Sequence, residues 1–79
     1  MVLKQFIEEK NVTGFETVSN LILNVVVGEE RYQLDADTSQ LQAGTQLSLV
    51  ETFTIDGDLL TVDGITVNTT EVNVNYESE

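Results

Sequence analysis

Apolar and polar residues alternate with a period of two from Gln46 to Val67, and this pattern predicts short β-strands joined by tight turns. Asp63-Gly64 separates two alternating runs in this stretch. Asp-Gly in this setting favours a type I′ hairpin turn, because both central residues need a positive φ. Residues 46–76 are therefore predicted to form a β-meander. The register of its tight hairpin pairs Val62 with Ile65, Leu60 with Val67 and Thr61 with Thr66.

A second alternating region covers residues 19–36 and predicts another hairpin. Gly28-Glu29 suits a type II′ turn, in which the first central residue has a positive φ. Leu21, Leu23, Val25 and Val27 are expected on one face of the first strand. The predicted pairs are Val25 with Tyr32, Leu23 with Leu34, Leu21 with Ala36, Val26 with Arg31, and Asn24 with Gln33.

Residues 1–11 have the spacing of a short amphipathic helix. Val2, Leu3, Phe6 and Ile7 fall on one face, and charged or amide side chains fall between them. Asn11 is expected to end the helix in the left-handed conformation. Because so short a helix is marginal alone, its apolar stripe is expected to pack on the sheet.

The other segments are less regular. Residues 12–18 fit neither period, although Phe15 and Val18 are expected core contacts, and residues 37–45 are expected to be a connector with one helical turn. Residues 71–77 alternate and predict a last strand, exposed or at a sheet edge. The predicted fold is α+β: one domain spanning residues 1–79, with an N-terminal amphipathic helix packed on a small antiparallel sheet, or partly closed barrel, of five to six short strands.

Glu51 interrupts the apolar face of the meander. Strict alternation would place it between Leu49 and Phe53 on that face. A β-bulge at Val50-Glu51 would instead turn Val50 inward and Glu51 outward, and a third possibility is that Glu51 borders a groove or a partner surface. A bulge or a sheet-edge location is favoured, because an unpaired buried carboxylate is costly.

Charge is the unusual property of this chain. Its 79 residues contain 14 acidic and three basic side chains, which gives a net charge of −11. Nine of the acidic residues and no Lys, Arg or His lie from Tyr32 onward. Such a surface repels nucleic acid and anionic membranes and attracts basic proteins or cations.

The composition gives little support for catalysis. The chain has no His and no Cys, so imidazole bases, thiolate nucleophiles and Cys-type zinc sites are excluded, and we expect no enzyme and no cofactor. Asp56-Gly57-Asp58 and residues 35–39 hold only fragments of a calcium-loop pattern, so turn formation is the favoured interpretation of both. The first residues resemble neither a signal peptide nor a membrane span, so a cytoplasmic location is expected.

These observations predict a non-enzymatic acidic module that occupies a basic surface of a partner protein, including a nucleic-acid-binding surface. In size and charge the chain is similar in general character to phage-encoded inhibitors that mimic nucleic acid. Direct binding to nucleic acid or membranes is not expected. The predicted partner-binding residues are Asp56, Asp58, Asp63, Glu71, Glu77 and Glu51.

Two alternatives remain open at this point. The chain could be a structural β-domain that self-associates through edge strands or assembles into a larger virion-like or surface particle, and both a monomer and a small homo-oligomer fit the sequence. A metal-binding or halophile-adapted domain is the third interpretation.

Overall fold

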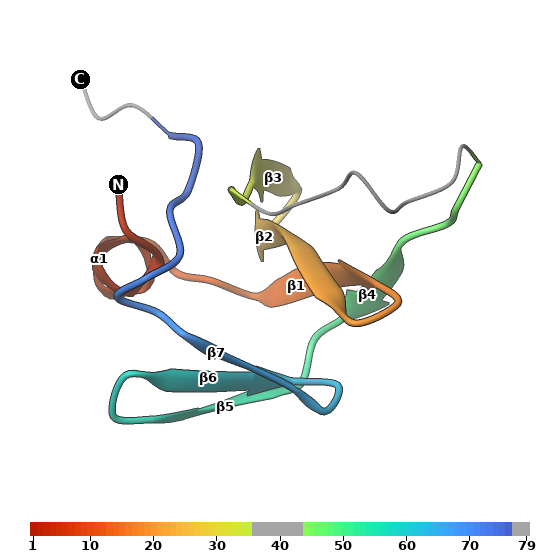
Figure 1. The fold of residues 1–79 in the computed structure, drawn as a ribbon. Coiled ribbons are helices and arrows are strands. Elements are labelled where there is room, and N and C mark those ends of the chain that lie inside the picture. The colour runs from red at the N-terminus through yellow and green to blue at the C-terminus, as the bar shows by residue number, and fades with distance from the viewer. Residues whose placement is uncertain (36–43, 77–79) are drawn as a thin grey trace.

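The computed structural model describes residues 1–35 and 44–76, which form one helix and seven strands in two antiparallel sheets (Figure 1). The first sheet has the order β3-β2-β1-β4 and the second β5-β6-β7. The α+β class is confirmed, but seven strands in two open sheets replace the expected five to six strands in one sheet or barrel. The elements are α1 (Leu3–Glu9), β1 (Gly14–Val18), β2 (Leu21–Val27), β3 (Glu30–Gln33), β4 (Ser48–Val50), β5 (Phe53–Asp56), β6 (Leu59–Val62) and β7 (Ile65–Asn68).

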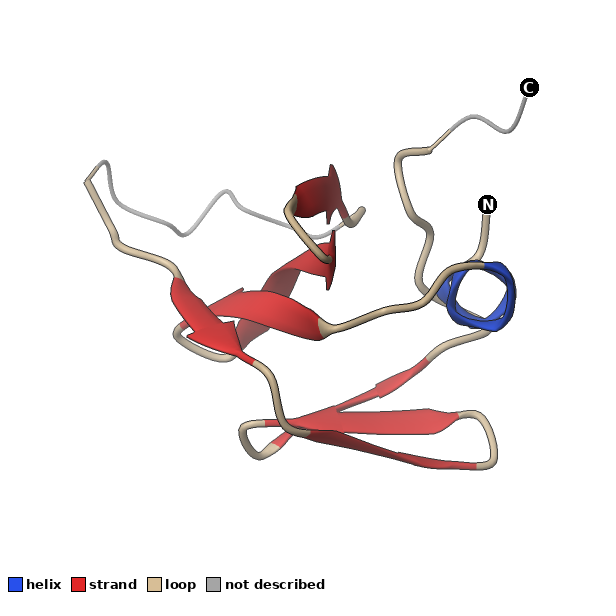
Figure 2. Ribbon diagram, turned by 180° about the vertical axis from the view of Figure 1, so that it is seen from behind, coloured by secondary structure: helices blue, strands red, loops and turns tan. Residues whose placement is uncertain are grey.

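One hydrophobic core joins both sheets, the helix and the C-terminal segment. The second sheet lies beneath the first in the view of Figure 1, and α1 lies to one side of both (Figure 2). Each of these parts contributes buried apolar side chains, so the two sheets and the helix are held as one unit. The core residues are Leu3, Phe6, Phe15, Ile22, Val25, Leu34, Leu60, Val62 and Val74.

Helix α1 is shorter than the predicted residues 1–11. Its first turn has no side-chain cap; instead the Leu3 and Lys4 amides donate to the carbonyls of Val72 and Thr69 at 2.7 and 3.0 Å. These bonds satisfy two of the amides that a helix start leaves unpaired. The prediction for Asn11 was wrong: the helix ends because Lys10 takes an extended conformation, and Asn11 has no positive φ.

Strand β1 is the segment whose periodicity was ambiguous in the sequence. All five of its residues are buried, because it lies between β2 and β4, with Phe15 opposite both Val25 and Val50. The register against β2 shifts between Glu16 and Thr17. This shift turns Ile22 into the core and leaves Leu21 and Leu23 half-buried, although Leu21 and Leu23 were predicted to face it. The predicted alternation holds only for Val25 and Val27, which follow the shift along β2.

The β2–β3 hairpin follows the predicted register, with Val25 opposite Tyr32. The predicted pairs of Val26 with Arg31 and Asn24 with Gln33 are also confirmed. Gly28 has a φ of 62° and Glu29 has no positive φ, as a type II′ turn requires. The predicted partner Ala36 and the expected helical turn of the connector lie outside the described residues.

The β6–β7 hairpin confirms all three predicted pairs: Val62 with Ile65, Leu60 with Val67, and Thr61 with Thr66. Asp63 and Gly64 have φ values of 50° and 80°, which is the type I′ geometry. The hydroxyls of Thr61 and Thr66 lie 3.1 Å apart on the outer face.

The first part of the predicted meander, residues 46–56, is divided between the two sheets. Strand β4 pairs with β1, the chain crosses at Glu51 and Thr52, and β5 then pairs with β6. Glu51 is exposed and Val50 is half-buried against the core. The side chains therefore point as the bulge prediction expected, but the passage between sheets is the cause.

The C-terminal segment of residues 72–76 forms isolated β-bridges instead of the predicted last strand, and it is not a sheet edge. On one side the Val74 amide donates to the Met1 carbonyl at 2.7 Å. On the other side the Asn75 amide donates to the Gln33 carbonyl at 2.8 Å. The segment therefore lies between the N-terminal residues and the end of β3.

Three aromatic rings fix this arrangement. Phe6 of α1, Tyr32 of β3 and Tyr76 contact one another edge to face, with ring centroids 5.2 to 5.6 Å apart. Such pairs add stability beyond their buried area, because the ring edge of one meets the face of the next. The trio therefore joins the helix, the first sheet and the C-terminal segment.

Candidate partner-binding surface

The predicted acidic residues lie at opposite ends of the second sheet. Asp56 ends β5 and Asp58 lies in the β5–β6 turn, while Asp63 lies in the β6–β7 turn at the other end. Glu71 lies near the end of the sheet that holds Asp56 and Asp58, because the amide of nearby Thr69 donates to the Asp58 carbonyl at 2.8 Å. Glu51 lies near the Asp63 end, because it comes two residues before Phe53, which is opposite Val62.

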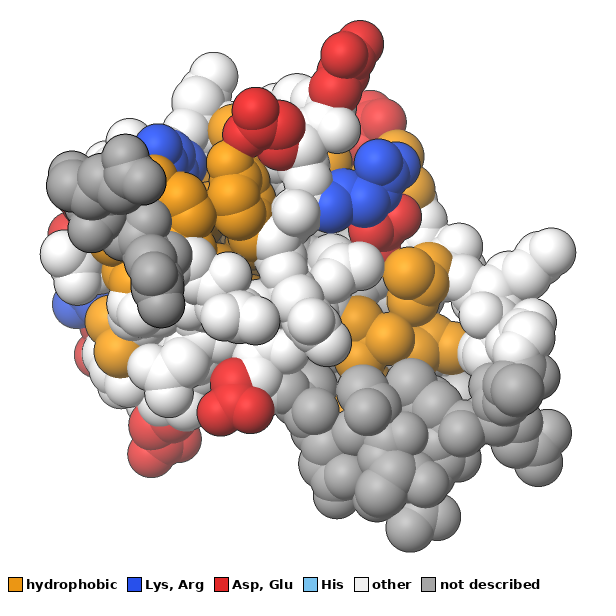
Figure 3. Space-filling view, turned by 90° about the horizontal axis from the view of Figure 1, so that it is seen from above, with side chains coloured by type: hydrophobic (Ala, Val, Ile, Leu, Met, Phe, Trp, Pro, Cys, Tyr) orange, Lys and Arg blue, Asp and Glu red, His pale blue; other side chains and the backbone are white. Residues whose placement is uncertain are grey.

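The five of these residues that the structure describes therefore do not gather at one place. A four-residue strand separates the two ends by roughly 13 Å, at about 3.3 Å per residue. Asp56, Asp58, Asp63, Glu71 and Glu51 are all exposed, and Glu77 lies outside the described residues. In the view from above (Figure 3) acidic side chains are likewise spaced apart and not aligned in a row.

Asp58 differs from the other predicted residues because its charge is paired. Lys4 Nζ lies 2.7 Å from Asp58 Oδ1, and both side chains are about half exposed. The hydrogen bond to Asp58 and its negative charge raise the pKa of Lys4. No local pattern in the sequence could have shown this pair, since its members are 54 positions apart.

All three basic side chains of the chain are engaged within the molecule. Besides Lys4, Arg31 Nε lies 2.9 Å from Glu16 Oε2. Lys10 Nζ lies 5.1 Å from the centroid of the Tyr76 ring, and its interaction with Tyr76 raises the pKa of Lys10. Among the described residues the acidic side chains without an ion pair are Glu8, Glu9, Glu29, Glu30, Asp35, Glu51, Asp56, Asp63 and Glu71.

Glu16 is a buried carboxylate that the sequence did not reveal. It lies on β1 with 8% of its surface exposed, and it accepts a hydrogen bond from Asn24 Nδ2 at 3.0 Å as well as the contact from Arg31. Its neighbours come from β2 and β3, so they could be identified only with the register of β1 in hand. This network links β1, β2 and β3, and the Glu16 carboxylate is not available to a partner protein.

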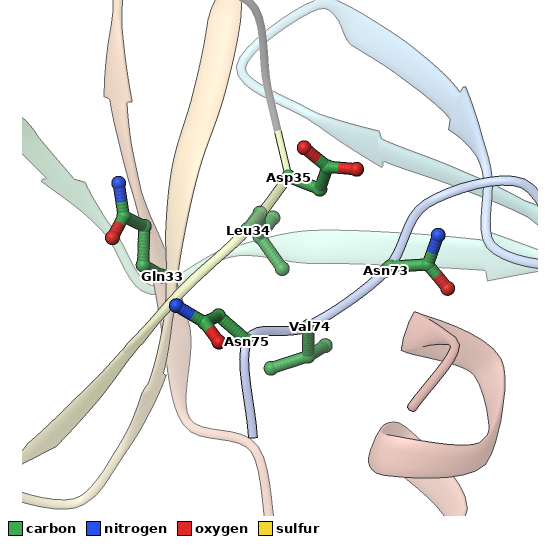
Figure 4. A pocket seen from close by; sticks show the side chains of 6 residues that line it. All are labelled: Gln33, Leu34, Asp35, Asn73, Val74 and Asn75. Carbon is green, nitrogen blue, oxygen red and sulfur yellow. The ribbon is translucent and has the colours of Figure 1, made fainter. Parts of the chain in front are cut away.

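A polar pocket of about 390 Å³ lies where the end of β3 meets the C-terminal segment (Figure 4). Its polar side chains are Gln33, Asp35, Asn73 and Asn75, and Leu34 and Val74 complete the lining. Asp35 is the one ionisable group among these six. The lining offers hydrogen bonds but no pair of acid and base.

The charged ends of the second sheet adjoin apolar edges. Ile55 on β5 is 45% exposed, although Leu60 opposite it is fully buried. A notch of about 90 Å³ lies between α1 and the β5–β6 turn, lined by Lys4, Ile7, Glu8, Ile55, Gly57 and Thr69. On β4 and just before it, Leu49 and Leu47 are also exposed.

No family model, curated protein or solved structure significantly matches this chain. Within the described ranges, no group of three or more Asp or Glu side chains is placed to hold a metal ion. The helical part of these ranges includes nothing long and apolar enough to cross a membrane.

Proposed function

We propose that this protein is a non-enzymatic acidic binding module that occupies a basic surface of a partner protein. The observation that supports this proposal is the engagement of Lys4, Lys10 and Arg31 within the molecule. Because every basic side chain is already engaged, none offsets the unpaired surface carboxylates. An approaching protein therefore meets a negative electrostatic potential. A partner rich in Lys and Arg is attracted, whereas nucleic acid is repelled.

The spread of the surface carboxylates favours fast association steered by charge, and it does not favour a single strong ion pair in the complex. These carboxylates lie on α1, at strand ends, on the turns and on the linker between the sheets, so their fields add at a distance. Charges at the rim of an interface change the association rate and its salt dependence. Mimicry of nucleic acid is the narrower form of this proposal, and it would need carboxylates spaced like phosphates on the bound face.

Binding kinetics test the proposal. A partner captured from lysate at low salt is purified, and its association with the wild type and with the variant D56N/D63N/E71Q is measured at about 50 and 300 mM salt, where the Debye length falls from about 14 to 6 Å. We expect slower association for the variant and for the wild type at high salt. Asp58 is left unchanged because it pairs with Lys4, and Asn at position 63 keeps the tight turn.

The matched control replaces three neutral residues of the second sheet, T54S/T61S/T66S, and should associate like the wild type. An association rate that neither salt nor the acidic substitutions change would contradict the proposed function.

A structural β-domain that self-associates is the second candidate, and a specific observation favours it. Strands β4 and β5 are edge strands, and exposed Leu47, Leu49 and Ile55 lie on or beside them. Exposed apolar edges are common sites of strand-to-strand assembly. Light scattering after size exclusion at two concentrations separates the candidates, because only self-assembly raises the mass with concentration.

A further inference from the structure

The outer edge of β5 has backbone groups with no partner in the described part of the chain. Asp56 and Leu59 are the ends of a two-residue turn and form a hydrogen-bonded pair. Bonded and non-bonded pairs alternate along an antiparallel ladder, so the amide and carbonyl groups of Ile55 and Phe53 point away from β6. This edge can therefore accept another strand.

The side chains beside this edge are apolar where the sheet faces the core. Ile55 and Phe53 point toward that face, opposite the buried Leu60 and Val62, and Ile55 lines the notch of about 90 Å³ together with Ile7 of α1. A water molecule takes about 30 Å³ in the liquid, so the notch has room for a few carbon atoms of an inserted side chain. An aliphatic residue of a bound strand would fill it.

The charges around the β5 edge favour particular side chains next to the aliphatic residue of the bound strand. Asp56 lies on the opposite face of β5 from Ile55, and Glu8 borders the notch. Neither carboxylate has an ion pair among the described residues. Successive side chains of a strand point to opposite faces, so an aliphatic residue in the notch places its neighbours beside Asp56. Lys or Arg would be the favoured neighbours.

A second copy of this chain is a poor occupant, because each copy has a net charge of −11 and like charges repel across the contact. We propose that the β5 edge binds an extended segment of another protein in which aliphatic residues alternate with Lys or Arg, adding a strand to the β5-β6-β7 sheet. The inference rests on the proposed function and assigns the place and the mode of binding.

The test uses a synthetic capped peptide of alternating Lys and Ile. One control peptide has the same composition with its Ile residues in a block, and another has Ser in place of Ile. Affinity is measured by fluorescence polarisation, and amide exchange is followed residue by residue by NMR. The alternating peptide should bind tightest and slow the exchange of the Ile55 and Phe53 amides, since strand addition gives them partners.

The decisive variant is Ile55→Lys, and the matched control is Thr66→Lys. Both residues are exposed and both changes add the same charge, but Thr66 lies on β7, at the far edge of the sheet from β5, and faces away from the notch. We expect Ile55→Lys to weaken binding about tenfold, as the loss of an interface anchor does, and Thr66→Lys to have a much smaller effect. Melting curves confirm that both variants fold.

Each other outcome overturns a distinct claim. If all three peptides bind alike and both variants behave alike, attraction is by charge alone; the inference fails and the proposed function stands. If no basic peptide binds at low salt and the captured partner's association is also insensitive to salt, both fail. If the Ile55 and Phe53 amides become protected when the protein alone is concentrated, a second copy occupies the edge and the inference is overturned.

Discussion

Gly14 lies so close to the backbone of Val50 that a Cβ atom on residue 14 would be 2.7 Å from the Val50 carbonyl oxygen. The same atom would be 3.3 Å from the Cα of Glu51. Only glycine fits such a close approach of two backbones. Gly14 therefore permits β4 to leave the first sheet at the position where the chain crosses to the second.

Replacing Gly14 with Ala should destabilise the fold by about 3 kcal/mol, the upper range for added atoms in packed sites. Urea denaturation measures the change. Gly28→Ala is the control: Gly28 has a φ of 62° and no atom within 4 Å of an added Cβ, so only backbone strain of about 1 kcal/mol is expected. If Gly14→Ala proved the milder of the two, the close approach would be wrong.

Two adjacent leucines of β6 give a direct test of the core. Leu60 is fully buried and Leu59 is 47% exposed. Leu60→Ala should therefore cost about 2 to 5 kcal/mol of unfolding free energy, and Leu59→Ala about 0.5 kcal/mol or less. Equal losses in denaturant titrations would mean that the facing of the β6 side chains is wrong by one residue.

The two ion pairs between described residues should differ in importance. Arg31→Met leaves the nearly buried Glu16 carboxylate with Asn24 as its remaining partner, which should cost about 1 to 3 kcal/mol. The double variant R31M/E16Q should recover part of this loss, since no uncompensated charge remains. Lys4→Met breaks an exposed pair and should have a small effect that fades as salt is added. Thermal melts of the three variants check the order.

Salt should stabilise the fold. The unpaired carboxylates repel one another, and raising salt from about 10 to 150 mM shortens the Debye length from about 30 to 8 Å. We expect the Tm to rise over this range, with an uncharged osmolyte at matched osmolality as the control. A flat or falling Tm would show that the carboxylates are too far apart to matter.

Tyr32 should titrate above the ordinary tyrosine range. A hydrogen bond to the Glu30 carboxylate is the main cause that raises its pKa. Because the folded pKa exceeds the unfolded value near 10, the associated stability is present below about pH 10 and lost as pH rises through the folded pKa. Absorbance titration in a Tyr76→Phe background isolates Tyr32, and Glu30→Gln should lower its pKa. An unchanged titration in that variant would show that the Glu30 carboxylate does not cause the shift.

The hairpins could be predicted because their signals are local. Asp63-Gly64 and Gly28-Glu29 specify their turns, and the alternation on either side fixes the register. The crossing at Glu51 was marked only by a polar residue in an otherwise apolar series, which a bulge explains as well as a change of pairing partner does. A period of two reports which face a residue is on, but not which sheet it belongs to.

The predicted acidic surface shows the same limit. The exposure of Asp56 and Asp63 followed from turn chemistry, which is local. The pairing of Asp58 with Lys4 and the burial of Glu16 depend on residues brought together from distant parts of the chain. Charge counts predict the sign of the surface, and only the fold shows which carboxylates are available to a partner.

The position of residues 72–76, between the N-terminal residues and β3, has a consequence for how the chain folds. The contact between Met1 and Val74 spans 73 positions, so the closing loop is almost the whole chain. The entropy of so long a closure must be lost before its contacts give any stability, which is why folds with non-local pairing reach the native state slowly, in milliseconds to seconds. Early intermediates should contain the local hairpins of the two sheets, and protection of the Val74 amide in pulsed hydrogen exchange should come last.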